Sequence, residues 1–404
     1  MTKKLFRLSE HQLSQNWLAQ FRSSEDRALA EQLINQIKLV SGRDFESGIE
    51  SALDRLQVQC SATIAVYPVT PPNPENVIGY GPFSGGITAG DVQSRQAGRR
   101  EQHGSEGRVA HIIANLQRKH LRPNGTSVIE CTPTIKQLCS QGIRHIVLVD
   151  DVSGSGTRLV NYWKKVVPRY IKRLLSLKRF ELWIVLYAMT PKSRLALTKA
   201  LPNFPAFNHL ITVLPDSSLV DHVPSGVVKL CTQYAELIHM EDAAFGYRGS
   251  ACPFVFEHGC PNNLPAILWA SKKNWKGLFP NRAIPSEFRP HFDSEGTDRA
   301  CEALWKVNQP KLALSLLESL EGNRKLDTEQ WILLTLLGLR LRGVAESYLA
   351  SKLLMDNIVC SKLLELAGDM GLYDIAAKSV TAIGREYVSR FRMRYGKKER
   401  IASS

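Results

Sequence analysis

The stretch HIVLVDDVSGSGTR, residues 145–158, constrains the fold of this chain more than any other. Four apolar residues, 146–149, predict a short buried strand. Two adjacent carboxylates follow, Asp150 and Asp151, and then a loop of small residues that leads directly into a helical pattern. The order strand, acid pair, small-residue loop and helix is typical of an α/β domain that binds a ligand at the carboxyl end of the strand.

The loop has the residue types that a phosphate site requires. Its glycines let the backbone approach a ligand closely, and its hydroxyl side chains donate hydrogen bonds to phosphate oxygens. A helix start adds unpaired N–H groups and the positive end of the helix dipole. The predicted phosphate-binding residues are Ser153, Gly154, Ser155, Gly156, Thr157 and Arg158. The alternative is an Asp-Asp turn at a strand end, with Ser155 or Thr157 as a helix N-cap.

The segment resembles the motif with which type I phosphoribosyltransferases bind phosphoribosyl pyrophosphate (PRPP). That motif is an apolar strand, two acids and a Thr- or Ser-rich loop ending in Gly-x-Thr or Gly-Thr. The resemblance implies that Asp150 and Asp151 form the catalytic pair and face the ribose 2′ and 3′ hydroxyls, with the 5′-phosphate on residues 153–157. It also implies pentosyl transfer with Mg²⁺ as cofactor, held near the acids through water rather than by direct protein ligation.

Composition narrows the class of protein. The 404 residues are enough for two or three domains. No apolar run reaches the roughly 18 residues of a membrane span. The start, MTKKLFRLSEHQ, lacks the apolar segment of a secretory signal. Eight scattered cysteines without a CxxC pair fit reduced thiols, so we expect a cytoplasmic protein that does not bind a membrane.

The net charge of +14 favours polyanionic partners, either nucleic acid or phosphorylated small molecules. A solvated basic surface without a specific role is the alternative. Part of the excess is local, because residues 385–400 contain seven basic side chains and only two acidic ones.

Strand-like and helical segments alternate in the middle of the chain. Strands are expected at 63–69, 127–131, 181–187 and 209–214. This alternation predicts a Rossmann-like α/β fold with a mainly parallel sheet, as in type I phosphoribosyltransferases. We expect three parts: N-terminal helices that pack on the next domain (1–56), a phosphoribosyltransferase-like domain (57–290), and a C-terminal domain that is all-helical or winged-helix-like (299–404).

A PRPP site also needs groups that bind pyrophosphate. The candidates precede a helix that starts at residue 106, and they are Arg99, Arg100, Gly104 and Ser105. The glycine-rich loop at 81–90 is a second candidate, and each of these segments is equally readable as a solvated loop.

The segment CPFVFEHGCPNNLPAILW, residues 252–269, combines cysteine, histidine and amide side chains. The spacing of Cys252, His258 and Cys260 matches no common zinc ligand set. The better interpretation is a loop on the acceptor side of the site, with Glu257, His258, Asn262 and Asn263. With WLAQF near the N-terminus and the helix GSEGRVAHIIANL, the segment resembles phosphoribosyltransferase-like proteins of bacterial conflict and anti-phage systems, including retron-associated effectors.

The chain beyond a linker at 281–298 is helical. Its element order resembles a winged-helix domain, in which residues 381–384 would end the wing and Arg385 would begin the last helix. A plain helical bundle that binds a partner is the alternative. The recognition position falls on 358–368, which is not strongly basic, so backbone contacts to DNA or RNA would dominate. The predicted nucleic-acid contacts are Lys362, Arg390, Arg392, Arg394, Lys397 and Lys398.

Three functions stay open. The first is an effector of an anti-phage system that acts on PRPP or a nucleotide. Its regulator would be a partner protein or nucleic acid, including reverse-transcribed DNA with a reverse transcriptase. The second is a non-catalytic DNA-binding regulator that senses PRPP or a nucleotide. The third is a salvage transferase, against which the long helical extensions argue. A homo- or hetero-oligomer is compatible with each.

Overall fold

The computed structural model describes residues 8–70, 83, 105–123, 127–201, 209–272, 274–292, 296–321, 326, 328–353, 355 and 357–395. Contacts within the chain divide it into two compact units. The larger unit is Gln20–Pro285, and the smaller consists of Met1–Ala19 with Ser286–Ser404. Among the helices described, none combines the length and apolar character needed to span a membrane.

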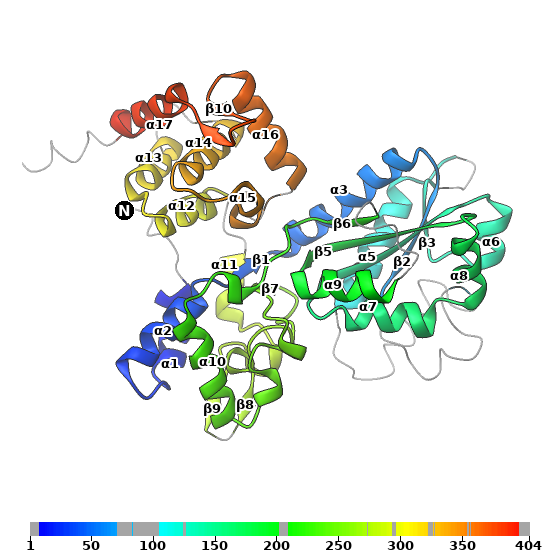
Figure 1. Ribbon diagram of the computed structural model, residues 1–404, viewed down its shortest axis with the longest axis horizontal. Coiled ribbons are helices and arrows are strands. Elements are labelled where there is room, and N and C mark those ends of the chain that lie inside the picture. Colours follow the sequence, from blue (N-terminus) through cyan, green and yellow to red (C-terminus); the bar gives the residue numbers. More distant parts are fainter. Residues whose placement is uncertain are drawn as a thin grey trace, which may run out of the picture. The chain divides into compact units, whose positions relative to one another are not determined.

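The larger unit is built on a five-stranded parallel sheet with the strand order β3-β2-β4-β5-β6 (Figure 1). The strands are β2 (Ile64–Pro68), β3 (Ile129–Cys131), β4 (His145–Ser153), β5 (Glu181–Met189) and β6 (Leu210–Thr212). The central strands β4 and β5 are nearly continuous apolar runs, which suits strands covered by helices on both faces. The predicted α/β fold with a parallel sheet is therefore confirmed.

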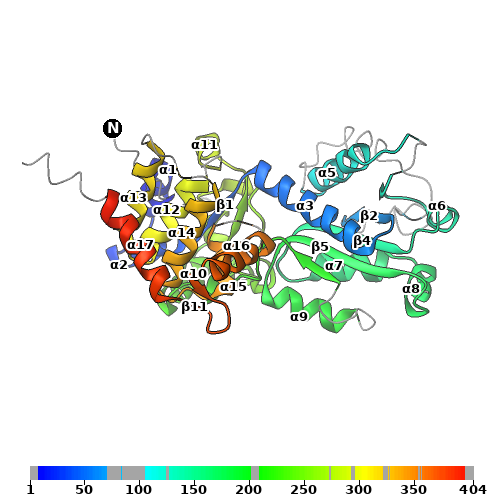
Figure 2. The same ribbon diagram turned by 90° about the horizontal axis from the view of Figure 1, so that it is seen from above.

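Helices cover both faces of this sheet. Helices α3 and α5 pack on one face, and α7, α8 and α9 lie on the other (Figure 2). The bounds are α3 (Gly42–Cys60), α5 (Ser105–Lys119), α6 (Ile135–Ser140), α7 (Thr157–Asn161), α8 (Arg169–Ser176) and α9 (Pro191–Ala200). A π-helical segment, Tyr162–Val166, continues α7 and ends before Pro168, which cannot donate a helical hydrogen bond.

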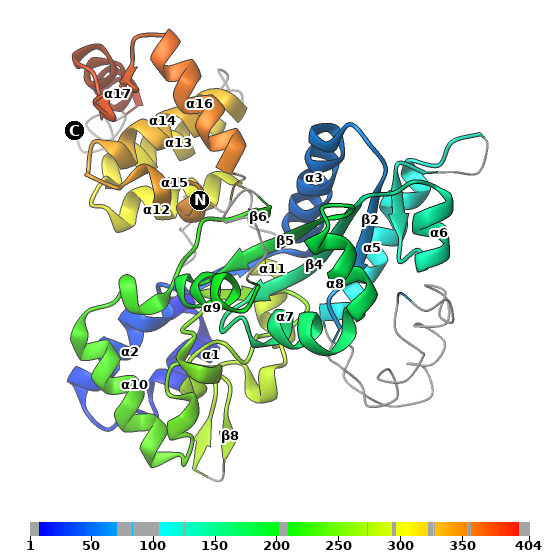
Figure 3. The same ribbon diagram turned by 45° about the vertical axis from the view of Figure 1, so that its right-hand side comes forward.

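The rest of the larger unit joins distant parts of the sequence. Strand β1 (Lys38–Val40) pairs in parallel with β7 (Phe254–Phe256), so the stretch expected to be wholly helical contains a strand. Three residues are too few for a periodic pattern, and the partner lies over 200 residues away. Helix α2 (Ser24–Ile34) lies beside α10 (Ser225–Leu237) in Figures 1 and 3.

A short antiparallel hairpin completes the larger unit, formed by β8 (Ser271–Lys272) and β9 (Trp275–Lys276). Trp275 anchors it, because its ring is buried against Phe21 and Tyr234 and its Nε1 donates to the Ile267 carbonyl over 2.9 Å. The hairpin is therefore fixed to the body of the unit.

The smaller unit is helical, as expected for the C-terminal region. Its helices are α1 (Gln12–Leu18), α11 (Arg289–Phe292), α12 (Gly296–Lys306), α13 (Pro310–Glu321), α14 (Thr328–Arg340), α15 (Glu346–Leu353), α16 (Asn357–Asp369) and α17 (Ala382–Tyr395). Leucines from α12, α13 and α14 form the centre of its buried core.

A two-stranded hairpin, β10 (Tyr373–Asp374) and β11 (Ser379–Val380), separates α16 from α17. The last helix begins at Ala382, three residues before the predicted start at Arg385. The Thr381 hydroxyl accepts a 3.0 Å hydrogen bond from the Gly384 N–H, which caps the helix and explains the earlier start.

Candidate functional site

The two acids lie within the carboxyl-terminal end of β4. The strand does not stop at residue 149 as expected, because its pairing with β5 continues to Ser153 opposite Met189. Asp150 and Asp151 are only 1% and 4% exposed. The neighbouring strands are parallel, so this edge of the sheet is where a ligand of an α/β domain binds.

Each buried carboxylate has a basic neighbour. Arg158, in α7, places Nη1 2.9 Å from Asp150 Oδ1 and 3.5 Å from Asp151 Oδ1. His258 Nε2 lies 4.0 Å from Asp151 Oδ2. Two buried oxygens, Asp150 Oδ2 and Asp151 Oδ1, accept no hydrogen bond from the described residues. Because buried polar atoms are almost always paired, these two oxygens are the atoms of the acid pair that have capacity for a further hydrogen-bond partner.

The two carboxyls differ in acidity. Burial raises the pKa of Asp150 well above 3.8, and the Arg158 guanidinium opposes this only in part. Burial acts in the same direction on Asp151. There, the neighbouring His258 side chain and the charge of Arg158 prevail and hold its pKa below 3.8. The pair therefore contains one carboxyl that ionises readily and one that ionises late.

This difference predicts a pH-dependent stability. Above pH 3.8 the unfolded chain loses the Asp150 proton while the folded chain retains it, so the free energy of unfolding falls as pH rises toward the raised folded pKa. Asp151 is ionised in both states there. We expect Asp150→Asn to gain stability relative to the wild type as the pH rises from about 4 toward the raised pKa of the folded Asp150. Urea unfolding across this range measures it, and a constant difference would contradict the assignment.

The loop after β4 is tied to the start of α9. Ser153 Oγ lies 2.6 Å from Ser193 Oγ, and the Thr190 hydroxyl donates to the Gly154 carbonyl. Gly156 has φ +73° and is the N-cap of α7, without a side-chain cap. The N-cap position therefore belongs to Gly156 rather than to Ser155 or Thr157. Ser155 Oγ donates to Thr157 Oγ1 over 3.0 Å and accepts a 3.4 Å hydrogen bond from the Thr157 N–H.

Close packing explains the glycine at 154. A Cβ there would lie 2.5 Å from Asn263 Cγ and 2.8 Å from Ser250 Cβ, closer than real contacts allow. The loop is thus held between α9 and the segment that contains Asn263.

Two cationic residues that the sequence analysis missed lie beside this loop. Arg248 Nη1 donates to Thr157 Oγ1 over 3.3 Å. The Lys192 ammonium, from the first turn of α9, donates to the Arg248 carbonyl. Arg248 comes from an irregular turn that no motif announces. Lys192 comes shortly after β5, the strand beside β4. Its place after a neighbouring parallel strand was the one sequence feature that could have indicated a residue near the site.

Comparison with protein families decides the identity of the larger unit. A family model described as PRTase-CE matches residues 14–281, more than half of the chain. The chain belongs to the PRTase-CE family. Its domain is phosphoribosyltransferase-like and occurs in conflict systems, which confirms the resemblance at this level. Comparisons with curated proteins and with solved structures gave no match.

The PRTase-CE match includes the segment expected on the acceptor side. His258 packs on Phe45 and Phe256 and contacts Asp151, and Asn263 lies beside Gly154. Glu257 has another role: its Oε2 accepts a 2.7 Å hydrogen bond from the Gly42 N–H at the start of α3. The exposed Asn262 accepts from the Tyr247 N–H through its carbonyl.

The remaining predicted positions of this PRTase-CE chain are only partly described. Arg99, Arg100, Gly104, Lys397 and Lys398 lie outside the described residues, as does the 81–90 loop apart from Phe83. Ser105 is the first residue of α5. Lys362 is exposed on α16. On α17, which also includes Arg394, Arg390 pairs with Glu386, and Arg392 donates to Gln309. Within the described ranges, no cluster of three His, Cys, Asp or Glu residues fits a metal ion.

Proposed function

We propose that the larger unit binds PRPP or a nucleotide together with Mg²⁺, and that the chain is a phosphoribosyltransferase-like effector of a retron-type anti-phage defence system. The observation that supports this most is the geometry at the end of β4. A buried acid pair, of which two oxygens accept no hydrogen bond from the described residues, directly precedes a loop in contact with Arg248. One edge of the sheet therefore offers acceptors for ribose hydroxyls and donors for a phosphate.

The acid pair suits the ribose and a magnesium ion. Asp150 Oδ2 and Asp151 Oδ1 are hard oxygen ligands of the kind that Mg²⁺ prefers. No third protein ligand is found in the described part of the chain, so waters and ligand phosphates would complete the coordination. The bound ion would neutralise the charge on departing pyrophosphate. Arg158 is 38% exposed, so its side chain has room to move aside when a ligand approaches the carboxylates.

The loop and its neighbours suit the 5′-phosphate. Arg248 contributes a guanidinium beside Thr157, and Lys192 holds the carbonyl of that arginine. A guanidinium binds phosphate through charge-assisted hydrogen bonds. The chain's own residues would thus hold both ends of a ribose 5-phosphate and orient its C1 toward an acceptor.

This arrangement gives a prediction for Arg248. A hydrogen bond to a charged group contributes about 1.5 kcal/mol or more, which corresponds to roughly tenfold in affinity. We expect Arg248→Gln to weaken PRPP binding about tenfold. Lys199→Gln, at an exposed position near the end of α9, should leave it unchanged. Calorimetric titration compares the two, and equal effects would argue against a phosphate at this loop.

A non-catalytic regulator that senses PRPP or a nucleotide is the second candidate, and one observation favours it. Glu257, an expected acceptor-side group, instead holds the start of α3 through the Gly42 N–H. His258 remains beside Asp151, at the right place for proton transfer but already in contact with a carboxylate. The effector enzyme and the non-catalytic regulator would use the same binding site, and only the enzyme would convert its ligand to product.

The smaller unit is the proposed route of control by nucleic acid or a partner protein. The order α15, α16, β10, β11 supports a winged-helix arrangement, with α16 in the recognition position and Lys362 exposed on it. Arg390 and Arg392 already contact side chains of the same unit, which leaves fewer cations for phosphate groups.

Pyrophosphate release tests the proposed function. The full chain would be incubated with PRPP, Mg²⁺ and a nucleotide extract, in parallel with an Asp150→Asn/Asp151→Asn variant. Release by the wild type alone would support the effector enzyme. PRPP binding without release under any condition would favour the sensor, and neither binding nor release would overturn the proposal. Phage challenge of cells expressing each form would test the defence role.

A further inference from the structure

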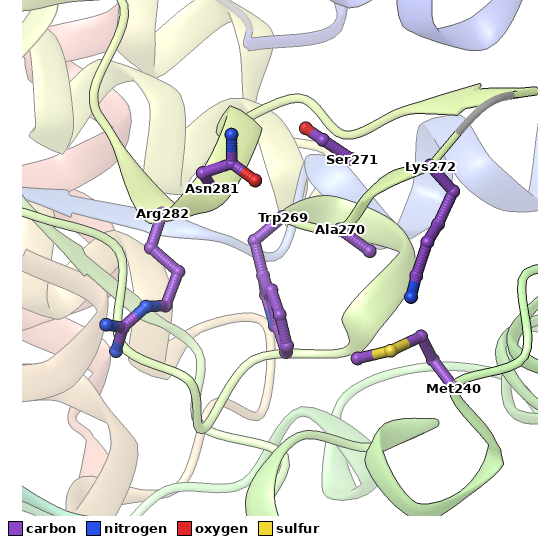
Figure 4. Close-up of a pocket in the computed structure, with 7 residues that line it drawn as sticks. All are labelled: Met240, Trp269, Ala270, Ser271, Lys272, Asn281 and Arg282. Carbon is purple, nitrogen blue, oxygen red and sulfur yellow. The ribbon is translucent and has the colours of Figure 1, made fainter.

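A pocket lies in the larger unit, at residues that the proposed function does not use. It has a volume of about 290 Å³ and is lined by Met240, Trp269, Ala270, Ser271, Lys272, Asn281 and Arg282 (Figure 4). Small-molecule sites in proteins start at ~300 Å³, so a ligand of this pocket is small or only partly enclosed.

The centre of the pocket is an aromatic platform. Figure 4 shows the Trp269 indole between the side chain of Arg282 on one side and those of Met240 and Lys272 on the other. The indole is fixed, because Trp269 Nε1 donates to the Leu264 carbonyl over 2.9 Å. Met240 is anchored through its N–H, which donates to the Ala235 carbonyl over 2.8 Å. An indole face and a thioether are apolar, polarizable surfaces that suit a flat aromatic ring.

The rim of the pocket is cationic and polar. Lys272, Asn281 and Arg282 are all exposed, so their end groups are accessible to a ligand. An amide recognises the edge of a nucleobase, because it both donates and accepts hydrogen bonds. The ammonium and guanidinium recognise phosphate. Among the described residues that line the pocket, none is acidic.

The backbone at the rim is strained. Asn281 and Arg282 have φ angles of +52° and +68°, a conformation that side chains other than glycine rarely adopt twice in succession. Hydrogen bonds hold this turn: the Asn281 N–H donates to the Trp269 carbonyl, and the Arg282 carbonyl accepts from the Cys260 N–H. Such strain gathers at ligand-binding positions. Here it brings an amide and a guanidinium to the indole.

We propose that this pocket is a second ligand site that binds a mononucleotide. The base stacks on Trp269 beside Met240, Asn281 bonds the base edge, and the phosphate lies at the rim on Lys272 and Arg282. The volume fits a base and leaves the phosphate outside, where the cations are exposed. The site would allow the chain to respond to a nucleotide separately from the acid pair of β4.

The test is titration of the full chain with AMP, in the Asp150→Asn/Asp151→Asn background so that the β4 site does not contribute. We expect one AMP per chain. Trp269→Phe retains a ring with less surface and should weaken binding severalfold, while Trp269→Ala should weaken it tenfold or more, since stacking is worth ~1–3 kcal/mol per base. Adenosine and inorganic phosphate, titrated separately, should each bind more weakly than AMP.

Charge reversal at two exposed lysines gives a matched pair of variants that leaves the buried core unchanged. Lys272→Glu should weaken AMP binding about tenfold. Lys276→Glu, exposed on the partner strand of the same hairpin but not in the pocket lining, should not. Equal effects of the two changes would overturn the proposal, as would the absence of AMP binding. Inorganic phosphate binding as tightly as AMP would also overturn it. Because the Asp150→Asn/Asp151→Asn background lacks the acid pair, and the Lys272 and Lys276 variants change only the hairpin, the outcome is distinguishable from failure of the proposed function.

Discussion

Replacing both Asp150 and Asp151 by asparagine is expected to abolish PRPP binding and leave the fold intact. The change keeps the side-chain shape but removes the carboxyl groups, which in their ionised form would bind Mg²⁺ and accept hydrogen bonds from ribose hydroxyls. Hydrogen bonds to charged groups contribute about 1.5–3 kcal/mol each, so losing two corresponds to at least roughly 100-fold in affinity. The fold should survive because Arg158, 38% exposed, can turn toward solvent when its partners become neutral.

A carboxylate elsewhere in the larger unit provides the control. Asp54 lies on α3, and its ion pairs with described residues are with Lys119 and His120 rather than with the β4 loop. Asp54→Asn should therefore bind PRPP as the wild type does. Calorimetry with PRPP and Mg²⁺ measures affinity, and circular dichroism with thermal unfolding checks the fold. If the double variant bound PRPP as tightly as the wild type, the acid pair would not be part of the PRPP site.

Gly246→Ala is expected to have the largest effect on stability of any single glycine change near the site. Gly246 has φ +75°, and a Cβ there would lie 2.2 Å from the Asn263 backbone oxygen. With ψ 178°, this conformation is essentially restricted to glycine and costs a residue with a Cβ about 1–3 kcal/mol, and overpacking against an immovable backbone adds about 1–3 kcal/mol. The same turn carries Arg248, so PRPP affinity should fall as well.

Gly142 gives a comparison without the close contact. Its φ is +65°, and a Cβ there would meet nothing within 4 Å. Gly142→Ala should therefore show only the conformational cost and normal PRPP binding. Chemical unfolding of both variants gives the difference in free energy of unfolding. If both variants lost the same free energy of unfolding, the close approach of Gly246 to Asn263 would add nothing to the cost of the substitution.

The part of the site that follows one strand was predictable from sequence. An apolar run, two acids and a small-residue loop are local in the chain, and buried parallel strands read as continuous apolar segments. The strand boundary was wrong by four residues, because the pairing of Ser153 with Met189 depends on β5 rather than on the residues of β4. The alternation of strands and helices likewise indicated the parallel sheet.

The rest of the site depends on contacts between segments far apart in the sequence. The hydrogen bond from Arg248 to Thr157 joins residues 91 positions apart in the sequence, and the one from the Gly42 N–H to Glu257 joins residues 215 positions apart. Composition and periodicity report neither contact, since both describe only neighbours along the chain. The parallel pair of β1 and β7 is another such contact, and it brings His258 next to Phe45 in α3.

A crystal structure of the full chain with PRPP and Mg²⁺ would test the central claim most directly. We expect the ribose hydroxyls and the ion at Asp150 and Asp151, the 5′-phosphate on residues 153–157, and Arg158 displaced from the carboxylates. PRPP bound elsewhere, with the ion pair between Arg158 and Asp150 intact, would contradict the assignment of this site.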